Sequence, residues 1–295
     1  MSNTVPDGSL IPLVSLEDTG ERLPSSCITR ETDLSRWLAL NRLEKTSCLK
    51  LLDQLLLDTF GIATETPGIS NEVTTVDPSH AWKICCDAIS SSIPSLRPVV
   101  EKTFTETSTC LRPRNSTISQ SFTYDRGFHR VPFVYVDYSY SSKSLISLAH
   151  EFGHALQITA SNDSNVYARM PPISRECCAF VAEHCLIDYA RHSAPVLFSG
   201  LVAAWAKDNL YYLVDNAETL KRAFNKDTLS YHYSWNYPLA RLWSHWLWNE
   251  RHDNLADIFH TNGTSSEDIW GLKNIASSLD SGPSTLYSQT VPRDD

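Results

Sequence analysis

The chain has 295 residues, 42% of them hydrophobic, which is enough to bury the core of one large domain. Its formal net charge of -9 argues against a nucleic-acid partner, because such partners usually require a basic face. The sequence has no apolar run of about 18 or more residues, so we expect neither a transmembrane helix nor a membrane partner.

Residues 1–30 lack the basic start and the continuous apolar stretch of a secretory signal. We expect an extended or disordered leader there, and a cytoplasmic protein. The eight cysteines agree with this location, because they form no CxxC pair and are expected to be reduced, mostly buried thiols.

The first half of the chain predicts helices and then strands. Leucines recur at helical spacing from Asp33 to Ile62, and a second helical stretch starts at His80, so residues 31–115 are expected to form a helical layer. Two stretches rich in β-branched and aromatic residues follow in 116–140 and are joined at Asp125-Arg126-Gly127. They predict a small antiparallel sheet that leads directly into the next helix.

Helices dominate the rest of the chain. The pattern predicts a loose Ser- and Pro-rich tail over 281–295 and one domain over 31–280, with its helical layer in 31–115 and its core in 116–280. The fold class is therefore mainly α (α+β), with the small sheet beside a central helix. The helices expected after the sheet cover 142–160, 173–192, about 195–223, about 237–251 and a short stretch from Ile269.

The segment LAHEFGHAL contains an HExxH pattern, made by His150, Glu151 and His154. Residues four apart lie on one face of a helix, so the two imidazoles can bind one cation while Glu151 lies beside it. Apolar residues near helical spacing support an amphipathic helix here. Such a pattern is typical of a zinc hydrolase that activates water.

A catalytic zinc ion needs a third protein ligand and an open position for water. The next predicted helix carries Glu176 and Glu183, which are seven residues apart and so lie on one face. Either carboxylate could reach the metal, and the alternative makes both of them solvated helix residues. Cys177 or Cys178 is a further possible ligand, although a carboxylate better suits a hydrolytic site.

Two stretches, PFVYVDYSYSSKSLISLAHEFGHALQ and MPPISRECCAFVAEHCL, resemble the catalytic core of the thimet oligopeptidase and oligoendopeptidase F family of zinc metallopeptidases. The resemblance implies a zincin-like helical fold, Zn²⁺ as the cofactor, and Glu176 as the third ligand. Glu183 then becomes the family's later glutamate, which could orient His150 or His154 through the free ring nitrogen.

The family also has a segment of His, Gly and Tyr residues that hydrogen-bonds the substrate, followed by a helix containing Leu-Trp. The corresponding sequence LSYHYSWNYPLARLWSHWLW offers Tyr231, His232, Tyr233 and Tyr237, although the usual glycines are absent. The resemblance implies that one of these side chains stabilises an oxyanion, and we favour His232 and Tyr237. The alternative interpretation is an aromatic core cluster.

These features predict a zinc-dependent metallohydrolase that cleaves an amide bond, with Glu151 as the general base and a short peptide as the substrate. The chain is much shorter than most family members, so the alternative is a zinc enzyme acting on a small-molecule amide or a modified peptide. A noncatalytic binding protein on a peptidase scaffold is a third interpretation. The sequence leaves the natural substrate, the cleavage position and the oligomeric state open.

Overall fold

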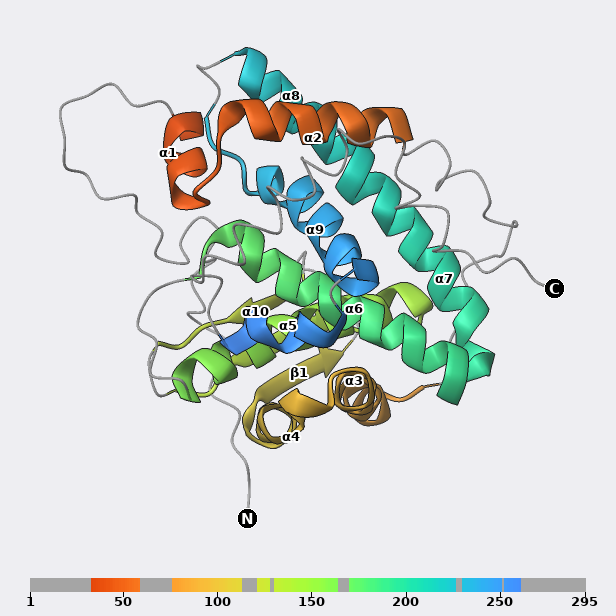
Figure 1. Ribbon diagram of the computed structural model, residues 1–295. Coiled ribbons are helices and arrows are strands. Elements are labelled where there is room, and N and C mark those ends of the chain that lie inside the picture. The colour runs from red at the N-terminus through yellow and green to blue at the C-terminus, as the bar shows by residue number, and fades with distance from the viewer. Residues whose placement is uncertain are drawn as a thin grey trace.

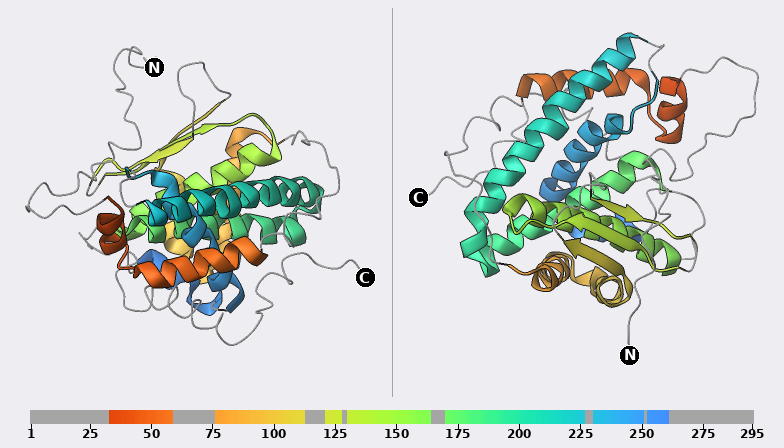
Figure 2. Two further views of the ribbon diagram at one scale, coloured as in Figure 1. Left: turned by 90° about the horizontal axis from the view of Figure 1, so that it is seen from above. Right: turned by 180° about the vertical axis from the view of Figure 1, so that it is seen from behind.

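The computed structural model describes residues 33–58, 76–112, 121–127, 130–163, 170–226, 230–250 and 252–260. The predicted leader, the short helix from Ile269 and the predicted tail lie outside the described residues. Helices predominate in the described part of the chain, and one small sheet lies along one side of them (Figure 1; Figure 2, left), so the mainly helical fold class is confirmed.

The first predicted helical stretch is divided into α1 (Asp33–Leu40) and α2 (Lys45–Asp58). Arg42 ends α1 in the left-handed region, with a φ of 55°. The Leu43 amide donates to the Leu38 carbonyl, as in the Schellman motif that ends many helices. Glycine usually takes the left-handed position, so an arginine there gives no sequence signal for the break.

Two helices cover one side of the molecule, at the bottom of Figure 1. α3 (Pro78–Ser92) begins after Asp77, whose carboxylate accepts hydrogen bonds from the Ser79 and His80 amides. A short 3-10 turn, η3 (Pro94–Leu96), and α4 (Arg97–Glu106) follow. Both α3 and α4 pack against the helix that carries the HExxH pattern.

The sheet has three strands in the order β1-β3-β2. The expected antiparallel pair is confirmed: β2 (Phe122–Tyr124) pairs with β3 (Phe133–Asp137). β1 (Ser108–Arg112) pairs with β3 in parallel, so the sheet is mixed. The expectation of helices alone in 31–115 was wrong, because β1 lies there. None of the β1 residues is fully buried, because this strand forms by pairing with β3 and has no hydrophobic pattern of its own.

The HExxH pattern lies on α5 (Ser142–Asp163), which passes between the sheet and α6 (Figure 2). Ser141, just before this helix, and Ser144, in its first turn, form a reciprocal cap. The Ser144 amide donates to the Ser141 hydroxyl at 3.2 Å, and the Ser141 amide donates to the Ser144 hydroxyl at 3.1 Å. The cap fixes where α5 begins, directly after β3.

The central helix is α6 (Pro172–Ser193), and most of its residues are buried. It packs against α5, α3, α7 (Pro195–Asn209) and α9 (Tyr237–Glu250), so it is buried along most of its length and is exposed only at its last residues. Its first turn is capped from a distance: the Ile173 amide donates to the side-chain oxygen of Asn41 at 3.0 Å. The turn after α1 thus fixes the start of the helix that carries Glu176.

The helix expected over about 195–223 consists of three segments, because a π-helical stretch, η4, joins α7 to α8. A short 3-10 turn, η5, leads into α9, whereas η6 and α10 were not predicted. None of the described helices combines the length and apolarity needed to cross a bilayer. The bounds are α7 (Pro195–Asn209), η4 (Leu210–Asp215), α8 (Asn216–Asn225), η5 (Tyr233–Asn236), α9 (Tyr237–Glu250), η6 (His252–Asn254) and α10 (Leu255–His260).

Candidate metal centre

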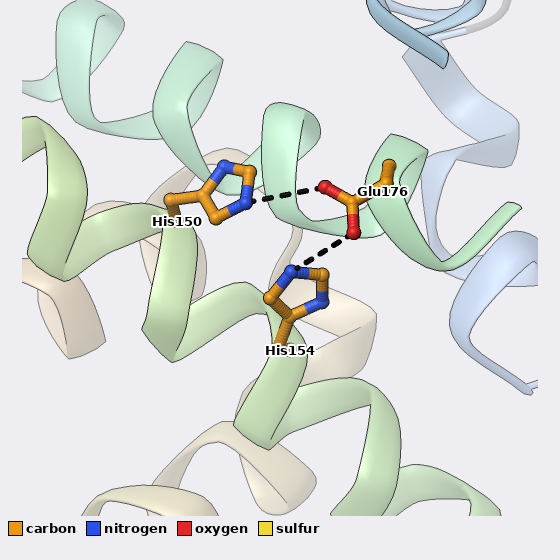
Figure 3. Close-up of side chains that lie close together, drawn as sticks. All are labelled: His150, His154 and Glu176. Carbon is orange, nitrogen blue, oxygen red and sulfur yellow. Dashed lines mark ion pairs between the residues drawn. The ribbon is translucent and has the colours of Figure 1, made fainter. Parts of the chain in front are cut away.

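α5 and α6 bring three side chains with metal-binding atoms together. Nε2 of His150 lies 3.4 Å from Oε2 of Glu176, and Nε2 of His154 lies 3.5 Å from Oε1 of the same carboxylate. Figure 3 shows both imidazole rings, which come from α5, pointing toward the carboxylate on α6. One ligand atom from each residue lies within 4.8 Å of the other two.

This group fits a zinc ion. Two imidazoles and one carboxylate are a common donor set for catalytic zinc, and they leave one position for water. Oε2 of Glu176 is buried without a hydrogen-bond partner among the described residues, which is unusual for a buried polar atom and would be resolved by a bound cation. Within the described ranges, His150, His154 and Glu176 are the one group of this kind.

A glycine sets the distance between the two helices. A Cβ atom on Gly153 would lie 2.7 Å from Cα of Ala179 and 2.9 Å from Cβ of Ala182. These distances are too short for a side chain, so hydrogen at this position lets α5 and α6 approach each other. The close approach brings His154 next to Glu176.

Two of the three groups are in the form that binds a cation, a neutral His154 and an ionised Glu176, whereas His150 must lose a proton to do so. Burial disfavours the charged form of His150, but its contacts with the Glu176 and Glu183 carboxylates outweigh burial and raise the pKa of this imidazole to about 10. Burial prevails at His154 and lowers its pKa to about 3. Burial also opposes ionisation of Glu176, but His154 and His150 outweigh it and lower the pKa of this carboxyl to about 2.

Glu183 lies behind His150 and outside the group of ligand atoms. Its Oε1 is 2.8 Å from Nδ1 of His150, and its Oε2 accepts a hydrogen bond from Arg241. Nδ1 is the ring nitrogen that faces away from Glu176, so Glu183 can orient this ring. Of the two glutamates that the sequence left open, Glu176 is therefore the one whose carboxylate meets both imidazoles.

A residue of the sheet holds Glu151 in place. The Thr123 hydroxyl on β2 lies 2.7 Å from Oε2 of Glu151 and 2.9 Å from the backbone carbonyl oxygen of the same residue. Burial raises the pKa of the Glu151 carboxyl to about 7, which suits a group that gains and loses a proton near neutral pH. Thr123 was not identified from the sequence, where only its place in a predicted strand was visible.

Tyr233 connects the segment before α9 to the metal centre. Its hydroxyl donates to Oε1 of Glu176 at 2.6 Å and accepts a hydrogen bond from Arg175 at 3.1 Å. The Tyr237 ring packs against it, with the ring centroids 5.9 Å apart. Burial, together with the nearby Glu176 charge, raises the pKa of both phenols well above the ordinary value, so both keep the proton that a donor needs.

Tyr231 and His232 make local contacts instead. The Tyr231 hydroxyl accepts a hydrogen bond from Asn236 at 3.0 Å, and its ring packs against Trp235 with centroids 5.6 Å apart. His232 is exposed, and its Nδ1 lies 2.7 Å from the Ser234 hydroxyl at the start of η5. Of the four candidates for the oxyanion, only Tyr233 and Tyr237 are thus linked to the metal centre by the contacts described here.

No protein-family model matches the sequence, and a comparison with curated proteins finds no match. A solved structure assigned as an oligoendopeptidase F from Bacillus anthracis str. Ames matches with a TM-score of 0.53 and 12% identity, over 88% of this chain and 59% of that one. Another, assigned as a peptidase from Chlamydophila abortus, matches with a TM-score of 0.52 and 14% identity, over 85% of this chain and 57% of that one.

The chain shares the fold of these peptidase structures. This likeness confirms the zincin-like helical fold class that the sequence predicted. The chain spans less than two thirds of the length of either structure. Their activities and substrates are therefore not transferred to it by the fold.

Proposed function

We propose that this chain is a zinc-dependent metallopeptidase that hydrolyses an amide bond in short peptides. The observation that carries the proposal is the convergence of His150, His154 and Glu176. Glu151 follows His150 on α5 and adds a carboxyl group beside them. The fold shared with solved peptidase structures supports it.

The residues around the centre have complementary roles in this proposal. Zinc, when bound, supplies a Lewis acid that makes water a better nucleophile. Glu151, held by Thr123, accepts the proton of the attacking water and passes it to the leaving nitrogen. Tyr237 is a protonated donor that packs beside Tyr233 and could stabilise the developing oxyanion, whereas the one hydroxyl proton of Tyr233 is already donated to Glu176.

The sheet supports an extended peptide as the substrate. β2 is an edge strand in the order β1-β3-β2, and its central residue, Thr123, contacts Glu151. A peptide that paired with the edge of β2 that no described strand occupies would place its backbone beside the general base. Peptide pairing also supplies main-chain hydrogen bonds that a small amide could not make.

We also propose that the protein is cytoplasmic. None of the cysteines among the described residues is in a disulfide, which agrees with a reducing compartment.

The proposal is tested with metal-depleted protein that is then loaded with zinc. We expect it to cleave members of a mixed library of short peptides after loading and to leave them intact before loading, with the products identified by mass spectrometry. Cleavage of small-molecule amides alone would favour the alternative substrate class. A protein that binds zinc and peptides but hydrolyses neither class would be a noncatalytic binding protein, and the proposal would be wrong.

A further inference from the structure

A completely buried arginine lies behind the metal centre. The side chains of Arg241 on α9 and Glu183 on α6 are 0% and 1% exposed and form an ion pair through Nη1 and Oε2. Nε of Arg241 donates to Oδ1 of Asn209 on α7 at 2.5 Å. The centroids of the Phe180 and Trp205 rings each lie 4.7 Å from the guanidinium carbon. Groups from α6 and α7 therefore hold the guanidinium of α9 in place.

A buried ion pair of this kind is weak evidence for a stabilising role. Removing two charges from water is costly, and apolar side chains of similar volume are often as stable in the same place. The second oxygen of the carboxylate suggests another role. Oε1 of Glu183 lies 2.8 Å from Nδ1 of His150, and Nε2 of the same ring faces Glu176 at 3.4 Å. Arg241 is thus two contacts away from a metal-binding nitrogen.

We propose that Arg241 is a positioning residue for the metal centre and acts through Glu183 on His150. Contacts at both oxygens fix the plane of the Glu183 carboxylate, and this plane fixes the imidazole ring with Nε2 directed at the metal. The inference rests on the proposed zinc site. It concerns one histidine only, because Nδ1 of His154 has no hydrogen-bond partner among the described residues.

The shape of the guanidinium matters as well as its charge. Its planar arrangement of donors reaches Glu183 and Asn209 at the same time while its faces lie against aromatic rings. A lysine could pair with the carboxylate as a point charge but could not reproduce this set of contacts. We therefore expect Arg241→Lys to restore part of the function of the arginine.

The experiment is a double-mutant cycle read out as zinc affinity, measured by competition with a chelator. Arg241→Met is expected to weaken zinc binding by roughly 10- to 100-fold. In a Glu183→Leu background the same substitution should change zinc affinity by less than about twofold, because the connecting carboxylate is gone. The visible absorption spectrum of the Co²⁺-substituted protein should also shift in Arg241→Met. Arg222→Met, an exposed arginine on α8, is the matched control and should change neither quantity.

Two variants keep the inference testable if Arg241→Met alone does not fold. Arg241→Met with Glu183→Leu removes both charges, and Arg241→Lys keeps the ion pair, so both should fold. Arg241→Lys is then expected to weaken zinc binding by less than Arg241→Met would, by up to roughly 10-fold. Wild-type zinc affinity in the folded Arg241 variants, or the same loss in both backgrounds, would overturn the inference. A wild-type protein that binds no zinc would overturn the proposed function with it.

Discussion

The two histidines of the HExxH pattern lie one helical turn apart, yet the structure surrounds them differently. On one side, His150 is linked through Glu183 to Arg241, whose guanidinium is held by groups from α6 and α7. On the other side, Nε2 of His154 contacts Glu176, which accepts a hydrogen bond from Tyr233. The His150 side is supported by a buried ion pair between Glu183 and Arg241. The His154 side depends on the close contact of α5 with α6 at Gly153 and on the Tyr233 hydroxyl.

This difference shows that a symmetric ligand pattern can be supported asymmetrically. The spacing of a helix presents both rings to the same point, but the orientation of each ring depends on what meets its second nitrogen. We therefore expect substitutions on the two sides to act on different quantities. Changes around His150 should affect metal affinity, and changes around His154 should affect both metal affinity and helix packing.

The largest expected effect is on turnover, when Glu151 is replaced. Glu151→Gln keeps the size of the side chain but removes the basic carboxylate, so turnover of a peptide substrate should fall by roughly 10²-fold or more. Zinc affinity should stay near that of the wild type. Steady-state kinetics and metal analysis of the same sample measure both, with Glu101→Gln, an exposed site on α4, as the control. Full turnover in Glu151→Gln would exclude this residue as the general base.

Tyr237→Phe removes a protonated donor that packs beside Tyr233. If this hydroxyl meets the oxyanion, the catalytic constant should fall by roughly 10²-fold with little change in the Michaelis constant. Tyr231→Phe is the matched control, because its hydroxyl contacts Asn236 and its loss should cost about 1 kcal/mol of stability without changing turnover. A Tyr237 variant that loses only melting temperature would place this residue in the aromatic core.

Gly153→Ala tests the packing on the His154 side. The added Cβ would lie 2.7 Å from the Ala179 backbone, so α5 and α6 must separate or distort. Overpacking of this kind should lower the free energy of unfolding by about 1–3 kcal/mol, measured by chemical denaturation of the metal-free protein. Ser147→Ala, a half-buried site on the same helix, should change it by less than about 0.5 kcal/mol. Equal stability of the two variants would mean that the helix contact tolerates a methyl group.

Tyr233→Phe tests the hydrogen bond that the Tyr233 hydroxyl donates to Glu176. Loss of its hydroxyl leaves Oε1 without this donor, and zinc affinity should fall by roughly 10-fold. A loss larger than that of Arg241→Met would make the His154 side the stronger support and would reverse the comparison drawn above.

His232→Ala should give the smallest effect. The side chain is exposed and contacts Ser234, so we expect turnover close to that of the wild type. A fall of roughly 10²-fold in the catalytic constant would instead restore His232 as the oxyanion donor that the family resemblance implied.

Local spacing was sufficient to predict the side chains of the candidate metal centre, apart from the choice between Glu176 and Glu183. His150, Glu151 and His154 follow from the period of one helix, and the seven-residue interval from Glu176 to Glu183 follows from the next. The helices and the antiparallel pair of strands were visible as periodic patterns for the same reason. The resemblance to a peptidase family then selected Glu176, which the geometry agrees with.

The supporting contacts could not be predicted in this way, because they depend on how distant elements pack. Arg241 meets Glu183 across 58 residues, and Asn41 caps α6 across 132 residues. Both residues lie in stretches that the sequence predicts to be helical, but no local spacing indicates that either meets a distant partner. The parallel strand β1 was missed because its pairing with β3, and not its own sequence, makes it a strand.

Zinc binding by Glu176→Ala and Glu183→Ala tests the central claim most directly. The wild-type protein should hold about one zinc ion per chain after mild dialysis, and Glu176→Ala should lose it because a protein ligand is gone. Glu183→Ala should keep a measurable affinity, weakened by roughly 10- to 100-fold. A wild-type protein that holds no zinc, or a Glu183→Ala protein that loses zinc while Glu176→Ala retains it, would contradict this assignment of the metal centre.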